Sequence, residues 1–407
     1  MAAVVGALSV TVDPSGRFAY VANVNSNNVT TFSINPTTGV LTNTGTISAR
    51  SQASSIAMTP GASAPVSVRP RFAYVANADS DNVTTFSINP ATGALTEVGT
   101  EVAADNGPFS VTVDPSGRFA YVANQVSNNV TTFSINPTTG VLINTGTISA
   151  RSGATSIAMT PGASAPVSVR PRFAYVANFN SDDVTTFSIN PTTGALTKVG
   201  TEVAAGTQPF SVTVDPSGRF AYVANFNFSN VTTFSINPTT GVLTEVGSEV
   251  AAGDGPFSVT VDPSGRFAYV ANFDSDNVTT FSINPTTGAL TEVGTAVAAS
   301  DAPRSVTVDP SGRFAYVANG AFDNVTTFSI NPTTGVLTEV DTEVAAGDGP
   351  LSVTVDPSGR FAYVANNISD NVTTFNINTA TGVLTEVGTE VAAGDDPASI
   401  TVLGGYQ

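Results

Sequence analysis

The eleven residues "DPSGRFAYVAN" at 13–23 recur unchanged at 114–124, 215–225, 262–272, 309–319 and 356–366. Their core, "RFAYVAN", occurs eight times in the 407 residues, with its tyrosine at Tyr20, Tyr74, Tyr121, Tyr175, Tyr222, Tyr269, Tyr316 and Tyr363. Successive tyrosines are therefore 54, 47, 54, 47, 47, 47 and 47 residues apart. A period of this length indicates stacked supersecondary units, and because it fills the chain we expect one domain over residues 1–407.

Each repeat contains four short segments, for example "SVTV", "RFAYVAN", "NVTTFSIN" and "ALTEVGTEV". They are rich in β-branched and aromatic residues and too short for helices, so they predict four strands. The turns "DPSG" and "NPTTG" lie between the first and second and between the third and fourth strands. In these turns Asp or Asn accepts backbone hydrogen bonds, Pro presets φ and Gly adopts the left-handed conformation. The pattern predicts tight hairpins.

The "RFAYVAN" strand is apolar on both faces, with Phe18 and Tyr20 on one and Ala19 and Val21 on the other. A sheet of this kind must be covered on both sides. We therefore expect an all-β fold, a closed β-propeller with eight blades of four antiparallel strands, while a solenoid is the competing arrangement. A ninth copy of the first strand, "ASITVL" at 398–403, is expected to replace or flank "ALSVTV" at the ring seam, unless the chain is cut from a longer array.

These motifs also carry a resemblance to known repeats. "DPSGRFAYVAN", followed by segments such as "NVTTFSINPTTGALTEVGT" at 277–295, resembles the YVTN-type repeats of bacterial and archaeal surface proteins. It also resembles the lactonase propellers related to 6-phosphogluconolactonase. For the lactonases, the resemblance implies a cleft on the ring axis that hydrolyses a sugar lactone through acidic, Arg and His residues. This chain has no His, so that residue has no counterpart here.

Composition excludes several classes of function. The chain has no Cys, which excludes disulfides and thiolate chemistry, and without His it lacks the commonest general base. Its net charge of −17 argues against nucleic acid and anionic membrane surfaces as partners. No apolar run approaches the roughly 20 residues of a membrane helix, and no signal peptide is visible. We expect an extracellular or cell-surface protein of a prokaryote, either a monomer or a segment of a larger surface protein.

Differences among the repeats gather in the connections between second and third strands. Phe179, Phe226, Phe273 and Phe322 lie there on successive repeats, with Asp274 and Asp276 beside them, and Arg304 stands where several other repeats have Phe or Leu. Aromatic rings among Asp and Asn suit a carbohydrate or peptide ligand by stacking and hydrogen bonding. The alternative is that these rings only fill gaps between blades.

Near-identical blades offer the same groups many times, whereas catalysis needs unlike groups at one point. We therefore expect a noncatalytic recognition or scaffold propeller that binds a carbohydrate or peptide on its variable face, with no catalytic residue, metal ligand or cofactor. The alternative is a lactonase-like hydrolase at the channel mouth. It would use Arg304 and a metal-bound water on Asp254, Asp301 or Asp348. Calcium is weakly suggested by "DSDN" at 79–82 and 274–277, which is half of a calcium-loop pattern.

Overall fold

The computed structural model describes the backbone of residues 7–12, 18–23, 28–34, 41–48, 69–89, 91–160 and 173–405, and side chains within 72–89, 91–160 and 173–402. It separates into two compact units, one over Met1–Ser67 with Tyr406–Gln407 and one over Val68–Gly405. In the first unit, β1 (Ala7–Val12), β2 (Phe18–Asn23), β3 (Asn28–Ile34) and β4 (Leu41–Ser48) form one antiparallel sheet in chain order. The first repeat thus forms a complete sheet by itself.

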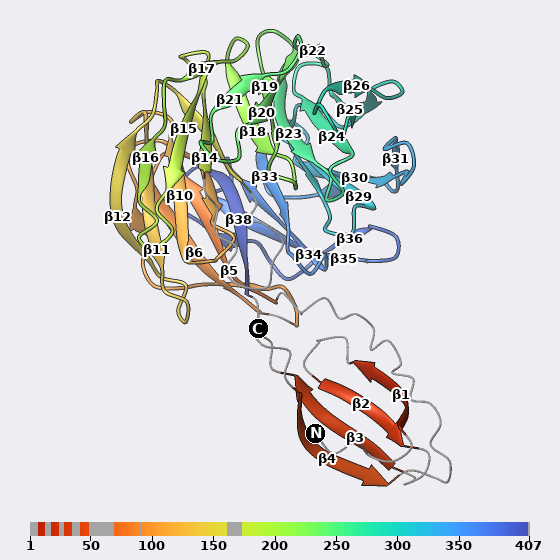
Figure 1. Cartoon of the computed structure of the whole chain (residues 1–407). Helices are drawn as coiled ribbons and strands as arrows, with labels where there is room; N and C mark the ends of the chain where they lie inside the picture. The colour runs from red at the N-terminus through yellow and green to blue at the C-terminus, as the bar shows by residue number, and fades with distance from the viewer. Residues whose placement is uncertain are drawn as a thin grey trace. The chain divides into compact units, whose positions relative to one another are not determined.

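The second unit consists of seven antiparallel sheets, the blades of a propeller (Figure 1). The innermost strands are β9 (Pro108–Val113), β13 (Ala154–Met159), β18 (Pro209–Val214), β23 (Pro256–Val261), β28 (Pro303–Val308), β33 (Pro350–Val355) and β38 (Pro397–Gly405). The second strands are β5 (Arg69–Asn77), β10 (Phe119–Asn124), β14 (Phe173–Asn178), β19 (Phe220–Asn225), β24 (Phe267–Asn272), β29 (Phe314–Asn319) and β34 (Phe361–Asn366). The third strands are β6 (Asn82–Ile88), β11 (Asn129–Ile135), β15 (Asp183–Ile189), β20 (Asn230–Ile236), β25 (Asn277–Ile283), β30 (Asn324–Ile330) and β35 (Asn371–Ile377).

The outermost strand is long only in the blade of β12 (Leu142–Ser149). In the others a short strand is followed by a second short piece that returns to the third strand. The first pieces are β7 (Leu95–Glu97), β16 (Leu196–Lys198), β21 (Leu243–Glu245), β26 (Leu290–Glu292), β31 (Leu337–Glu339) and β36 (Leu384–Glu386). The second pieces are β8 (Val102–Ala103), β17 (Val203–Ala204), β22 (Val250–Ala251), β27 (Val297–Ala298), β32 (Val344–Ala345) and β37 (Val391–Ala392). In most of these blades a glycine with positive φ, such as Gly247 at 71°, divides the edge.

The ring closes through the last strand of the chain. β38 pairs antiparallel with β5, from Pro397 opposite Asn77 to Gly405 opposite Arg69, and so becomes the innermost strand of the blade that contains β5, β6 and β7. The prediction of eight blades is therefore wrong: the structure has seven. The first repeat forms its own sheet, and the ninth copy of the first strand completes the blade of the second repeat, in a different sheet from β1.

Interlocking tyrosines join each blade to the next. The Tyr269 hydroxyl donates to the carbonyl of Gly335 in the neighbouring blade at 3.0 Å, and the last of these bonds returns from Tyr363 to Gly93 at 3.2 Å. The remaining bonds run from Tyr74 to Gly140, Tyr121 to Gly194, Tyr175 to Gly241, Tyr222 to Gly288 and Tyr316 to Gly382. Since the donors and acceptors form one cycle, the repeated tyrosine is a device of ring assembly.

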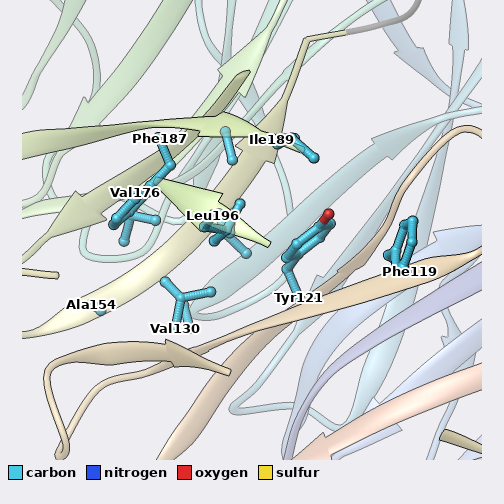
Figure 2. Close-up of a cluster of buried hydrophobic side chains, with 11 residues drawn as sticks. Phe119, Tyr121, Val130, Ala154, Val176, Phe187, Ile189 and Leu196 are labelled. Carbon is cyan, nitrogen blue, oxygen red and sulfur yellow. The ribbon is translucent and has the colours of Figure 1, made fainter. Parts of the chain in front are cut away.

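Burial of the second strand on both faces is confirmed. Every residue of Phe119–Asn124 is buried. Figure 2 shows one of the resulting cores, in which Tyr121 and Val130 of one blade lie near Val176 and Phe187 of the next. Such cores fill the spaces between the blades that the structure describes. Among the described residues there is no helix of the length and apolarity that a membrane span requires.

The "DPSG" turn has the structural role that its sequence predicts. Asp114 is buried, and its Oδ1 accepts hydrogen bonds from the backbone N–H groups of Arg118 at 2.8 Å and Phe119 at 2.7 Å. The carboxylates of Asp215, Asp262, Asp309 and Asp356 do the same. The turn that begins at Asp13 lies outside the described residues.

Candidate functional site

The innermost strands surround a cavity of about 160 Å³ on the ring axis, lined by the second and third residues of each strand. The third residue is always serine, at Ser110, Ser156, Ser211, Ser258, Ser305, Ser352 and Ser399. The second residue differs around the ring, in the order Ala398, Phe109, Thr155, Phe210, Phe257, Arg304 and Leu351. The cavity therefore has one layer that consists of serines and a second layer whose residues differ from blade to blade.

The serines are part of the scaffold as well as of the lining. Ser211 Oγ accepts the backbone N–H of Val259 on the next blade at 3.2 Å, and Ser258 Oγ accepts that of Val306 at 3.2 Å. Four further serines, Ser156, Ser305, Ser352 and Ser399, make the same bond. Because a hydroxyl carries one proton as well as its acceptor lone pairs, each of these groups can still donate toward the cavity.

Six phenylalanines form what we call the aromatic crescent at the mouth of the cavity: Phe109, Phe179, Phe210, Phe226, Phe257 and Phe273. Phe109, Phe210 and Phe257 come from innermost strands, and the others are the first residues of connections between second and third strands. Phe210 is central, with its ring centroid 3.8 Å from Phe257, 5.6 Å from Phe179 and 5.5 Å from Phe109. All six are partly exposed, whereas the phenylalanines of the third strands, such as Phe234, are fully buried.

The crescent ends at Arg304, which together with Asn367 begins a polar sector. The Arg304 guanidinium lies 5.7 Å from the centroid of Phe273, and its Nη1 donates to Asn367 Oδ1 at 3.5 Å. The first residue of its own blade's connection is Gly320, where three preceding blades have phenylalanine. A Cβ at position 320 would overlap the guanidinium. This blade thus has an arginine and a glycine at the two positions where each of the two preceding blades has phenylalanine, and the glycine leaves room for the guanidinium.

Asp396 adds a carboxylate to this polar sector. It precedes β38, has a left-handed φ of 54°, and its backbone N–H donates to Asp370 Oδ1 at 2.9 Å. Its own Oδ1 is buried and accepts no hydrogen bond from the described residues. Burial raises the pKa of the Asp396 carboxyl, and Asp79 and Asp370 raise it further, although a hydrogen bond from Asn367 and the charge of Arg304 oppose this.

Arg304, which lines the cavity, and Asp396 attract each other without direct ion-pair contact. Burial lowers the pKa of the Arg304 guanidinium, while the carboxylates of Asp396 and Asp323 counteract that effect. An arginine remains protonated throughout the physiological range. The cavity lining therefore carries a fixed positive charge and hydrogen-bond donor at Arg304, and the Asp396 carboxylate, whose Oδ1 is buried, acts on that charge.

The structure brings together only part of the predicted ligand site. Phe179, Phe226, Phe273 and Arg304 lie side by side at the mouth, whereas Phe322 is 63% exposed and makes no ring contact with the crescent. Phe322 is the third residue of its connection. The first residue of a connection is held at the mouth by a backbone hydrogen bond to the residue before the innermost strand. For example, the N–H of Phe273 donates to the carbonyl of Gly255 at 2.8 Å.

The predicted acidic residues have different positions. Asp276 has a left-handed φ of 51°, and its Oδ1 accepts the backbone N–H of Ala302 in the next blade at 2.9 Å. Asp81, Asp182, Asp323 and Asp370 make equivalent bonds, which accounts for the frequent Asp at this position. Asp274 is exposed beside Gly255. Asp276 therefore belongs to the scaffold, and Asp274 lies on the rim.

The alternative set of Asp254, Asp301 and Asp348 is exposed at the rim. In the part of the chain whose side chains are described, no three Asp or Glu residues are grouped as metal ligands. Sequence reasoning missed Asn367, Gly320 and Asp396. A comparison of repeats contains the signal for each: Asp396 stands where Gly255 and Gly349 occur, and both Asn367 and Gly320 stand where Phe226 and Phe273 occur.

Comparison with known proteins assigns the family. The profile described as "Lactonase, 7-bladed beta-propeller" matches residues 9–159, 156–260, 211–305, 252–353 and 302–401, which together cover most of the chain. The chain belongs to this lactonase family. The family's seven blades agree with the ring seen here. No curated protein matches the chain in sequence.

Solved structures similar to this lactonase-family propeller show the same fold. A protein from Bacteroides uniformis assigned as a 6-phosphogluconolactonase has a TM-score of 0.72 and 20% identity, over 82% of this chain and 99% of that one. One from Bacteroides fragilis with the same assignment has a TM-score of 0.67 and 23% identity, over 82% and 98%. The periplasmic gluconolactonase of Pseudomonas aeruginosa has a TM-score of 0.70 and 21% identity, over 82% and 99%.

These findings correct the expected function. The prediction of a noncatalytic cell-surface recognition or scaffold propeller is overturned by the lactonase family match, and the hydrolase that was the alternative is favoured. The repeated segments are alike in every blade. The blades differ from one another in the second residue of the innermost strand, in the residue before that strand and in the connection between the second and third strands.

Proposed function

We propose that this protein is a hydrolase that opens a lactone at the mouth of the central cavity. The observation that carries the proposal is the polar sector formed by Arg304, Asn367 and Asp396 beside the aromatic crescent. It holds the two groups that ester hydrolysis needs, a donor for the carbonyl oxygen and a base for water. Membership of the lactonase family supports this assignment.

In the proposed mechanism Arg304 donates to the carbonyl oxygen of the lactone and stabilises the oxyanion of the tetrahedral intermediate. Asp396 accepts a proton from water as the water oxygen attacks the carbonyl carbon. The bond between that carbon and the ring oxygen then breaks, and Asp396 returns the proton to the departing ring oxygen. The product is a hydroxy acid. Asn367 positions Arg304, because its Oδ1 accepts a hydrogen bond from Arg304 Nη1 at 3.5 Å.

The chain has no His to act as the general base, and burial raises the pKa of the Asp396 carboxyl, which makes Asp396 a better base. An ordinary Asp, with a pKa of about 3.9, is a weak base, and a higher pKa improves proton transfer. The base is active when it is deprotonated. We therefore expect kcat/KM to rise with pH through a pKa above the usual range of a carboxyl group, and to lose this dependence when Asp396 is replaced.

The test compares hydrolysis of simple δ-lactones by the parent protein, Asp396→Asn and Arg304→Leu. Asn tolerates the left-handed φ of position 396, and Leu occupies the equivalent channel position at Leu351. Each change should lower kcat at least about 100-fold with an unchanged melting temperature. Asp348→Asn, on the exposed rim, is the matched control and should retain activity. Parent hydrolysis no faster than buffer, or variants as active as the parent, would exclude this function.

A further inference from the structure

The aromatic crescent is larger than the proposed chemistry requires. Six rings extend over four neighbouring blades, and they are linked by centroid distances of 3.8 to 6.3 Å. Their faces remain partly exposed at the mouth, although the same chain buries its third-strand phenylalanines completely. A contiguous exposed apolar surface beside a polar cleft is typical of a binding surface for an apolar group.

The cavity beneath the crescent has room for one small ring. Its volume of about 160 Å³ is close to that of apolar protein cavities that hold a single benzene molecule, about 150 Å³. A five- or six-membered lactone therefore fits above the serine layer. A substituent on that ring has to leave the cavity at the mouth, where the crescent occupies one side.

The charges at the mouth disfavour a phosphorylated substrate. Arg304 is the sole cationic side chain among the residues that line the described cavity. The carboxylates of Asp396 and Asp323 act on Arg304, and those of Asp79 and Asp370 act on Asp396. A phosphate dianion at Arg304 would have one guanidinium as its cationic partner and would be repelled by the carboxylates of Asp396 and Asp323, whereas phosphate recognition ordinarily uses several Arg, Lys or backbone N–H donors.

We propose that the substrate is an uncharged lactone that carries an apolar alkyl, acyl or aryl substituent, with the carbonyl at Arg304 and the substituent on the aromatic crescent. This inference rests on the proposed lactone hydrolysis and names its substrate class. Burial of each methylene group of the substituent against the rings is expected to improve kcat/KM up to about fourfold, the equivalent of about 0.8 kcal/mol.

The experiment measures kcat/KM for δ-valerolactone, for δ-decalactone, which adds a five-carbon chain to the same ring, and for 6-phosphogluconolactone. We expect δ-decalactone to exceed δ-valerolactone at least about tenfold and 6-phosphogluconolactone to be the poorest substrate. Phe210→Thr and Phe226→Gln copy Thr155 and Gln125, which stand at the same positions in other blades. Each should reduce the ratio between the two alkyl lactones severalfold. Phe322→Ala is the control that should leave this ratio unaltered.

A second readout separates failure of this inference from failure of the proposed function. δ-Valerolactam and δ-decanolactam resist hydrolysis, so calorimetry with them measures recognition without turnover. Tighter binding of the decanolactam, weakened by Phe210→Thr, supports recognition of an apolar substituent even if no lactone is hydrolysed. If lactones are hydrolysed but the alkyl chain gives no advantage, or if 6-phosphogluconolactone is preferred, the substrate class is wrong while the hydrolase assignment stands.

Discussion

The seven interlocking tyrosines make the ring sensitive to alkaline pH. Tyr74, Tyr121, Tyr175, Tyr222, Tyr269, Tyr316 and Tyr363 are fully buried. Burial raises the pKa of each phenol well above its usual value of about 10. A phenol that stays protonated in the folded state but ionises in the unfolded chain stabilises the fold fully below pH 10. This stabilisation is lost as the pH rises above 10, since the unfolded state then binds fewer protons.

The size of the effect follows from linkage. At pH 11 an unfolded tyrosine with a pKa of about 10 contributes about 1.4 kcal/mol to unfolding, so seven contribute about 10 kcal/mol. The whole free energy of unfolding of a typical domain is about 5 to 15 kcal/mol. We therefore expect a single steep unfolding transition between about pH 10 and 11, in which the tyrosines ionise together because the ring opens.

The assay follows phenolate absorbance at 295 nm and circular dichroism during one alkaline titration. Both signals should change together and more steeply than a single ionisation. Tyr269→Phe should lower stability at pH 7 by about 1 kcal/mol, through loss of its bond to Gly335, and should reduce the alkaline slope by about one seventh. Gradual phenolate formation centred near pH 10 with intact circular dichroism would refute the reasoning, because it would mean that the tyrosines titrate in the folded ring.

Three further changes test the scaffold. Gly335→Ala places a Cβ against the Phe267 ring at a φ of 76° and should lower the free energy of unfolding by about 2 to 4 kcal/mol. Gly247→Ala, at a φ of 71° with no atom within 4 Å of the added Cβ, should lower it by about 1 kcal/mol. Equal losses of melting temperature in the two variants would contradict the packing role of Gly335. Asp262→Ala removes the acceptor for Arg266 and Phe267 and should cost about 2 to 3 kcal/mol in urea unfolding, so a negligible change would argue against the turn's importance. Deletion of residues 397–407 should expose the edge of β5 and cause association detectable by light scattering. Deletion of residues 1–67 should leave the melting temperature of the ring unchanged. The reverse pattern would disprove closure of the ring by β38.

The blade could be predicted from the sequence because its determinants are local. The "DPSG" turn, the "RFAYVAN" strand and the "NPTTG" turn each define their own conformation within a few residues, and the structure has them where the sequence places them. The number of blades could not be predicted in this way. Ring size depends on which strand edges finally meet, and here β38 pairs with β5, more than 300 residues away in the sequence. Both β38 and the segment "SSIAM" at 54–58 have the pattern of a first strand, so the pattern alone does not choose between them.

Part of the candidate site could be predicted from the sequence, because some of its residues differ from their equivalents in other repeats. Arg304 was recognised because it differs from its copies, and Phe179, Phe226 and Phe273 because they stand outside the regular pattern. The sequence does not reveal that Asp276 accepts a hydrogen bond from the next blade, because a carboxylate in that role has the same sequence signature as a rim ligand. The importance of Asp396 arises from burial and from Asn367, and neither is apparent from one residue among 21 Asp.

The repeat architecture itself explains how a nearly symmetric ring can hold an asymmetric site. Closure depends on the buried tyrosine, its glycine acceptor, the capping aspartate and the channel serine, which recur from blade to blade and therefore resist substitution. The second residue of each innermost strand and the first residue of each connection lie outside this repeated set. They face the axis, where seven copies converge on one cavity. Substitutions there alter the chemistry of the mouth at little cost to the ring, so Arg304 and Gly320 in one blade change the charge of the mouth, while the tyrosine and aspartate hydrogen bonds of that blade remain.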